Sequence, residues 1–355
     1  MNSSSNRFIL ERYNKFLPIT NKTPLLTLGE GGTPLVRSRI LENELGAAAV
    51  YFKLELSNPT GSFKDRGMIM AVAKAYENGA KAVLCASTGN TSASASAYAA
   101  KFGLESYVIV PSGFIAMGKL AQAIVYGAKI VSIDGSFDDS LKIAMTLVEK
   151  NNVTLVNSVN PHRIEGQKTG AFEIIDELQD TPDILCIPVG NAGNITAYWK
   201  GFNEYKNAKK IKSLPMMWGF QAAGAAPIVI DKKVDNPSTI ATAIRIGNPA
   251  SWDSAKLARD NSNGLIESVT DEEILFAYKK MAQEEGIFAE PACAAPIAGL
   301  IKKKKEGYNF NNKTIVSIVT GSGLKDPDTA LSIQSNIVDS IADPGEIAKI
   351  LNWDY

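Results

Sequence analysis

One lysine of this chain stands in a turn that suits covalent chemistry. The segment NPTGSFKDRG at 58–67 places Lys64 after a glycine turn and before a helical pattern that covers 65–78. The positive end of the helix dipole and partial burial both lower the pKa of such a lysine. A less protonated amine can form a Schiff base. The alternative is an exposed lysine in a turn, and other motifs must decide between the two.

Short apolar runs alternate with longer amphipathic segments, which predicts an open, mostly parallel α/β sheet. The runs that we interpret as strands are 82–86, 107–110, 129–133, 153–156, 184–189 and 314–319. Ligands of such sheets bind beyond the carboxyl ends of the strands. The loops that follow these runs are therefore the places to look for a site.

Three of those loops carry polar groups suited to binding. Ser87, Thr88, Asn90 and Thr91 open an alanine-rich helix that runs to about residue 102, and their hydroxyl, amide and backbone N–H groups suit a carboxylate. GNAGN at 190–194 also opens a helix and can wrap an anion such as a phosphate. Thr320 follows the last strand and can bond a ring nitrogen or a substrate. Each loop taken alone also fits an ordinary turn.

The phosphate loop is neither a Walker motif nor GxGxxG. Because it contains no lysine, it favours a permanently bound phosphate cofactor over nucleotide triphosphate chemistry. Four features occur together in this chain: a lysine that can bind an aldehyde, a phosphate loop, a polar partner for an aromatic nitrogen and a carboxylate site. Their combination predicts pyridoxal 5'-phosphate as the cofactor.

Composition narrows the class of protein. The chain has 355 residues, and its 37 lysines and arginines balance 37 acids, so no nucleic-acid surface is expected. No apolar stretch is long enough to span a membrane. Cys85, Cys186 and Cys293 form no CxxC pair, which argues against disulfides and zinc and fits a reducing cytoplasm. His162 is the only histidine. We therefore expect no metal, and we expect His162 to support its loop.

These residues resemble the fold-type II pyridoxal-phosphate enzymes, and within them the threonine synthases of the short, microbial type. The resemblance covers about 12–329, and 157–169 is its most discriminating segment, because dehydratases and cysteine synthases of the wider fold do not generally carry it. Cys293 stands where relatives often carry serine or alanine. The motifs are TLGEGGTPL at 27–35, NPTGSFKDRG, STGNTSAS at 87–94, GKLAQA, NSVNPHRIEGQKT, GNAGN and EPACAA.

For the fold, the resemblance implies two open, mostly parallel twisted sheets flanked by helices, as in the tryptophan synthase β subunit. It also implies a large cofactor-binding domain from 1–55 and 151–355, a small mobile domain from 56–150, and a homodimer. Periodicity alone does not give this division.

For the cofactor, the resemblance implies that Lys64 forms the Schiff base and serves as the base, that Asn90 bonds the ring hydroxyl, and that Thr320 faces the pyridine nitrogen. A threonine hydroxyl stabilises a protonated ring less than an aspartate would. The residues expected to hold the cofactor phosphate are Gly190, Asn191, Ala192, Gly193 and Asn194.

The substrate implied by the resemblance is O-phospho-L-homoserine. Its α-carboxylate would bind Ser87, Thr88 and Thr91, and its phosphate would leave before water adds and L-threonine forms. Arg163 is the first candidate for the phosphate of the substrate. The other candidates are Asn157, Ser158, Lys168 and Lys119.

Two other functions stay open at this point. A threonine or serine dehydratase would share Lys64, Asn90 and the phosphate loop but would need no second phosphate site. A catalytically silent protein of the same architecture would bind an amino acid or a phosphorylated metabolite without a lysine-dependent visible band.

Overall fold

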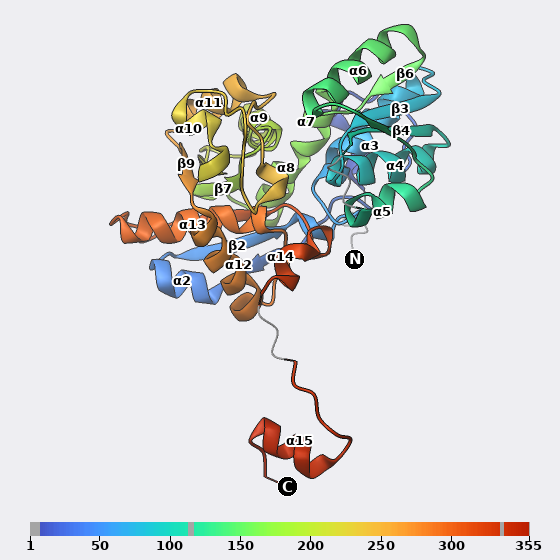
Figure 1. Ribbon diagram of the computed structural model, residues 1–355. Helices are drawn as coiled ribbons and strands as arrows, with labels where there is room; N and C mark the ends of the chain where they lie inside the picture. The colour runs from blue at the N-terminus through green and yellow to red at the C-terminus, as the bar shows by residue number, and fades with distance from the viewer. Residues whose placement is uncertain (1–7, 113–116, 334–336, 355) are drawn as a thin grey trace, which may run out of the picture.

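The computed structural model describes residues 8–112, 117–333 and 337–354. Within these residues ten strands form two sheets, each flanked by helices (Figure 1). The strands are β1 Leu35–Arg37, β2 Ala49–Leu54, β3 Ala82–Ala86, β4 Glu105–Pro111, β5 Lys129–Ile133, β6 Val153–Leu155, β7 Ile184–Pro188, β8 Met216–Ala222, β9 Leu265–Val269 and β10 Thr314–Val319. The α/β class and the two open, mostly parallel sheets expected from the sequence are confirmed.

The larger sheet has the strand order β1-β2-β10-β7-β8-β9. Only β1 runs antiparallel, paired with β2, and the other pairs are parallel. Because β10 lies beside β7, the loops after these two strands leave the same edge of the sheet. Those loops contain Thr320 and the GNAGN segment.

The smaller sheet is parallel throughout and has the order β5-β4-β3-β6. Strand β6 lies just beyond residue 150, the boundary expected for the small domain. The division into a large and a small mobile domain stays a prediction. All six strand predictions from periodicity are confirmed, whereas β1, β2, β8 and β9 were missed.

The longer helices pack on the faces of these sheets (Figure 1). They are α2 Arg39–Leu45, α3 Lys64–Glu77, α4 Asn90–Phe102, α5 Met117–Val125, α6 Phe137–Lys150, α7 Pro161–Gln167, α8 Thr169–Leu178, α9 Gly193–Asn207, α11 Trp252–Asn261, α12 Asp271–Glu285 and α13 Pro291–Lys305. Helix α15 Pro344–Leu351 lies away from the sheets (Figure 1). The shortest helical segments are α1 Ile9–Arg12, α10 Pro227–Ile230 and α14 Pro327–Leu331, and 3₁₀ turns occur at 14–16, 55–57, 223–225, 242–244 and 323–325.

Helices α3 and α7 approach each other closely, and two glycines make this possible. A Cβ at Gly67 would lie 2.8 Å from the carbonyl oxygen of Arg163, and a Cβ at Gly166 would overlap the backbone of Arg66. The glycines therefore bring the helix that begins with Lys64 against the helix that carries Arg163.

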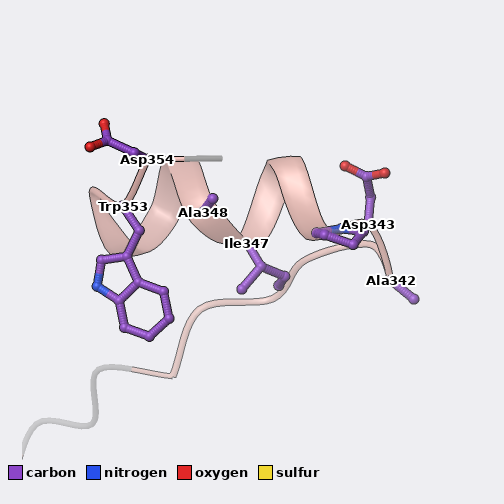
Figure 2. Close-up of a pocket in the computed structure, with 7 residues that line it drawn as sticks. Ala342, Asp343, Ile347, Ala348, Trp353 and Asp354 are labelled. Atoms are coloured by element: carbon purple, nitrogen blue, oxygen red, sulfur yellow. The ribbon is translucent and has the colours of Figure 1, made fainter.

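The last helix, α15, stands apart from the body of the protein (Figure 1). Ile347 and Trp353 project on the same side of it and border a shallow hollow, together with Ala342 and Asp343 (Figure 2). Trp353 is 70% exposed. The residues that line the hollow include no group that points to catalysis.

Candidate active site

Lys64 is the first residue of α3, so the helix begins one residue before the start expected from the sequence. Gly61 in the preceding turn has φ +82°, a conformation that favours glycine. The turn is fixed by Asp65, which accepts hydrogen bonds from the backbone nitrogen and the hydroxyl of Thr60 at 2.7 and 2.6 Å. The backbone nitrogen of Ser322 donates to the carbonyl oxygen of Gly61 at 2.9 Å. The turn therefore lies against the segment that follows β10.

The amine of Lys64 is prepared to react as a neutral group. Burial lowers its pKa to about 7, and the positive charge of Arg163 also lowers it, whereas Glu290 acts in the opposite direction. Among the described residues, none accepts a hydrogen bond from Lys64 Nζ, which lies 4.0 Å from the centroid of the Phe63 ring. The sequence anticipated the lowered pKa and the role of burial, but not the role of Arg163.

Asn90 begins α4, directly after the loop that leaves β3. Its Nδ2 donates a 2.7 Å hydrogen bond to Oε1 of Glu290. Ser87, Thr88 and Thr91 lie half-buried in the same loop and helix turn, beside the free N–H groups of the helix start. The structure thus brings the expected carboxylate-binding groups next to Asn90.

Asn157 holds the start of this loop in place. Its side-chain oxygen accepts a hydrogen bond from the Ala86 nitrogen, and its Nδ2 donates to the Ala86 oxygen, both at 2.9 Å. The amide therefore continues the strand pairing at the end of β3 and keeps one N–H for other partners. Ser158 follows it and is half-buried. Their proposed contacts with substrate stay predictions.

Thr320 lies at the end of β10 and is 5% exposed. Its carbonyl oxygen accepts from the backbone nitrogen of Phe63 at 2.9 Å, which joins it to the Lys64 turn. Its hydroxyl oxygen lies 3.3 Å from Sγ of Cys293. Cys293 is therefore a direct neighbour of the residue expected to face the pyridine nitrogen, a contact the sequence did not indicate.

The GNAGN segment forms a turn suited to an anion. Ala192 has φ +64° and precedes the first residue of α9, so consecutive backbone N–H groups converge at the helix start. Asn191 is anchored by its carbonyl oxygen, which accepts from the nitrogen of Ser251 at 3.1 Å. Both side-chain polar atoms of buried Asn194 have no partner among the described residues. Gly190 approaches the backbone of Ile244.

Arg163 is a buried cation without an acidic partner. It lies in α7, is 2% exposed, and its NH1 group donates only to the carbonyl oxygen of Val156 at 3.3 Å. Its Nε has no partner, and no described carboxylate forms an ion pair with it. Burial lowers its pKa to about 10. A buried guanidinium is unfavourable unless an anion pairs with it, so this arrangement points to a bound anion.

The other predicted cations are placed differently. Lys168 is buried at the end of α7 and forms ion pairs with Glu165 and with Glu204, the latter at 2.8 Å. These two ion pairs compensate the charge of Lys168. Lys119 belongs to α5, and its side chain lies outside the described part of the structure. His162 is half-buried, and the charge of Lys74 contributes to its lowered pKa, after burial.

A buried ionic network around Arg66 anchors α3, the helix that begins with Lys64. Arg66 follows Lys64 in α3 and binds Glu55 through Nε and Glu173 through NH2, at 2.5 and 2.6 Å. Lys53 in β2 also binds Glu173, at 3.0 Å. All four side chains are nearly inaccessible to solvent. The network ties α3 to β2 and to α8.

Two residues near Lys64 were not among the predicted site residues. Glu290 precedes α13, contacts Asn90 and is 4% exposed. Lys325 donates to the carbonyl oxygen of Thr60 at 2.9 Å and also to the side chain of Gln122 in α5. The EPACAA and GKLAQA motifs carry Glu290 and Gln122, so a signal was present, but their partners lie far away in the chain.

Metal-binding clusters and membrane-spanning helices are both absent from the described ranges of the chain. No group of three or more histidine, cysteine, aspartate or glutamate side chains suited to a metal ion was found there. No helix in those ranges is long and apolar enough to cross a membrane. Cys85, Cys186 and Cys293 are buried and form no disulfide within the described residues.

Comparison with known proteins agrees with this geometry. Residues 26–321 match the family model described as pyridoxal-phosphate dependent enzyme. A threonine synthase of Halalkalibacterium halodurans is 60% identical over 326 residues, which are 92% of each chain. A threonine synthase of Bacillus sp. is 55% identical over 342 residues, 96% of each chain. The structure of maize serine racemase has a TM-score of 0.74 at 20% identity and covers 93% of this chain and 95% of its own, which supports the fold alone.

The chain therefore belongs to the family of pyridoxal-phosphate-dependent enzymes, and within it to the threonine synthases. This membership agrees with the family and the cofactor expected from the sequence.

Proposed function

We propose that the residues around Lys64 hold pyridoxal 5'-phosphate in the way the sequence indicated. Lys64 carries a neutral amine at pH values above about 7, which suits covalent attachment to the cofactor aldehyde. The turn at 190–194 offers converging N–H groups and the unpartnered amide of Asn194 to the phosphate. Asn90 and Thr320 flank the lysine turn as partners for the ring. These features fit the cofactor.

We further propose that the substrate is O-phospho-L-homoserine, and the unpaired charge of buried Arg163 is the observation that carries this proposal. A cofactor phosphate at 190–194 leaves Arg163 free for a second anion. Its planar fork suits a phosphate group. A dehydratase substrate has no phosphate and would leave this buried cation uncompensated.

In this reaction the bound cofactor supplies an electron sink for the bond-breaking steps at the amino acid. The protein orients the substrate between two anion sites: Ser87, Thr88 and Thr91 bind the α-carboxylate, and Arg163 binds the phosphate. Lys64, as a neutral amine, removes the Cα proton. Loss of a Cβ proton then allows the Cγ–O bond to break, and Arg163 stabilises the departing phosphate. A proton is added at Cγ, the hydroxyl group of water adds at Cβ, and a proton returns to Cα to give L-threonine.

After phosphate has been eliminated, water must be directed to Cβ while the intermediate stays bound, because release of that intermediate would lead by hydrolysis to 2-oxobutyrate and ammonia. The contact of Lys325 with Gln122 joins the segment after β10 to α5 beside the smaller sheet. Such a contact supports the proposal that the small domain, 56–150, closes over the substrate.

Two assays run in parallel test the proposed function. Protein loaded with pyridoxal 5'-phosphate is given O-phospho-L-homoserine, and phosphate and L-threonine are measured together. A second sample is given L-threonine, and 2-oxobutyrate is measured. We expect equal yields of phosphate and threonine in the first sample and far slower turnover in the second. If only the conversion of L-threonine to 2-oxobutyrate is observed, the proposed binding of the substrate phosphate by Arg163 is refuted.

We also propose that the chain forms a homodimer in the cytoplasm and binds no nucleic acid. The exposed side chains of Ile347, Ile350, Leu351 and Trp353 on the separate C-terminal segment support an assembly, and three unpaired cysteines support a reducing compartment. Sedimentation of the full chain tests the dimer.

A further inference from the structure

Glu290 is a buried acid whose place in the fold calls for an explanation. It is the residue before α13, and its backbone nitrogen donates to the carbonyl oxygen of Gly321 at 2.9 Å. Its Oε1 accepts the hydrogen bond from Asn90, and its Oε2 has no partner among the described residues. A buried carboxyl with one unpaired oxygen is unfavourable for folding.

Two ordinary structural roles do not account for this side chain. An acid at the N-cap of a helix usually accepts from backbone N–H groups of the first turn, but Glu290 makes no such bond. No described lysine or arginine forms an ion pair with it. Burial raises its pKa, and the hydrogen bond from Asn90 and the charges of Lys325 and Lys64 offset this only in part. The carboxyl is directed to Asn90, 200 residues away.

The backbone around Glu290 is shaped to admit this carboxyl. A Cβ at Gly321 would lie 2.6 Å from both Cδ and Oε2 of Glu290. Gly321 directly follows Thr320, the residue expected to face the pyridine nitrogen. The carboxyl therefore occupies space beside the cofactor site that any larger residue at position 321 would fill.

The contact with Glu290 decides how Asn90 presents its amide. An asparagine can turn either its oxygen or its nitrogen toward a ligand, and only the nitrogen can donate to a ring oxygen. The oxygen of Glu290 accepts one of the two N–H groups of Asn90, so the nitrogen is fixed on the side of Glu290 and Lys64. Its second N–H stays available for the cofactor.

We propose that Glu290 is a positioning residue for the cofactor ring, which acts by fixing the amide orientation of Asn90 so that the Asn90 nitrogen donates to the ring hydroxyl oxygen. This inference rests on the proposed function in one respect, the contact between Asn90 and the ring. It adds a residue, and a role for it, that the motif assignments did not contain.

The test uses the cofactor without substrate. Full-length protein stripped of cofactor is titrated with pyridoxal 5'-phosphate, and the dissociation constant and the visible absorbance band are recorded at one pH. The variants are Glu290→Gln, Asn90→Ala and the double variant, with Glu306→Gln as a control, because Glu306 follows α13 at its exposed end. Circular dichroism checks that each variant is folded.

In Glu290→Gln the carboxamide can pair with Asn90 in either orientation, so the fixed orientation is lost. We expect a changed visible absorbance band and a dissociation constant for pyridoxal 5'-phosphate that is about fivefold higher, as for the loss of one hydrogen bond. Asn90→Ala should give a similar change, and adding Glu290→Gln to it should have no further effect. Glu306→Gln should match the wild type.

Additive effects of the two substitutions on the band and affinity would overturn the proposal, as would a Glu290→Gln variant that matches the wild type while Asn90→Ala does not. If Asn90→Ala itself changes nothing, the assumed contact of Asn90 with the ring is wrong. Should Glu290→Gln fail to fold, Glu290→Asp, which is too short to keep the 2.7 Å contact, replaces it in the same cycle. A wrong substrate assignment would leave all these results unchanged.

Discussion

The positive charge of Arg163 lies close enough to Lys64 to lower the pKa of its amine. Burial is the larger cause, and together the two effects bring this pKa to about 7. Neither side chain has an acidic partner in an ion pair within the described ranges. The two residues come from different helices, α3 and α7, which Gly67 and Gly166 allow to meet closely. One arrangement thus provides a reactive amine and an anion site beside it.

The first prediction concerns the pH at which Lys64 reacts. Only the neutral amine attacks the cofactor aldehyde, so the rate of cofactor capture by the stripped protein should reach half its maximum near pH 7. Arg163→Met removes a positive charge that lowers this pKa, and the half-maximum should move to higher pH. Arg39→Met, at an exposed arginine, serves as control. A half-maximum at the same or lower pH in Arg163→Met would contradict the coupling.

The second prediction concerns the phosphate of the substrate. Arg163→Met should lower kcat/KM for O-phospho-L-homoserine by roughly ten- to a hundredfold, the effect of losing a charge-assisted hydrogen bond. The rates are compared at a pH where Lys64 is neutral in both proteins. Binding of L-threonine, which has no phosphate, should change little. Equal losses for both ligands would mean that Arg163 has only a structural role.

A third prediction follows from the unpartnered amide of Asn194. If this side chain binds the cofactor phosphate, Asn194→Ala should raise the dissociation constant for pyridoxal 5'-phosphate by roughly tenfold. Asn207→Ala, at the exposed end of the same helix, is the matched control. Equilibrium dialysis measures both. An unchanged constant in Asn194→Ala would remove this residue from the site.

The fourth prediction concerns the contribution of the buried ionic network around Arg66 to stability. Arg66→Met leaves the carboxylates of Glu55 and Glu173 buried with fewer partners, so the free energy of unfolding should fall by about 3–5 kcal/mol. Arg39→Met removes an exposed arginine, and its partner Glu42 keeps the ion pair with Arg37, so this free energy should change by less than about 1 kcal/mol. Urea unfolding followed by circular dichroism compares them. Similar losses in both variants would mean that burial of the network contributes nothing.

Much of the site could be predicted because its residues follow apolar strands directly. The runs that became β3, β7 and β10 are buried along their whole length apart from half-buried Thr314, so their ends could be found from periodicity. The strands that were missed lack this signal. Strand β8 contains Gly219 and buried Gln221, and β1 has only three residues.

Contacts between distant segments could not be predicted from spacing. A glutamate before a proline, as at Glu290, reads as an ordinary helix start, and nothing local indicates that Asn90 is its partner. The pairing of Lys168 with Glu204 is of the same kind. A sequence shows which residue types are present, but only the fold shows which charges are already paired.

The measurement that tests the central claim most directly is the fate of oxygen when turnover of O-phospho-L-homoserine takes place in water labelled with heavy oxygen. If Cγ–O cleavage precedes addition of water at Cβ, the label enters the hydroxyl group of L-threonine and none enters the released phosphate. Mass spectrometry of both products reads this out. Label in the phosphate, with homoserine as the other product, would show hydrolysis at phosphorus and contradict the account.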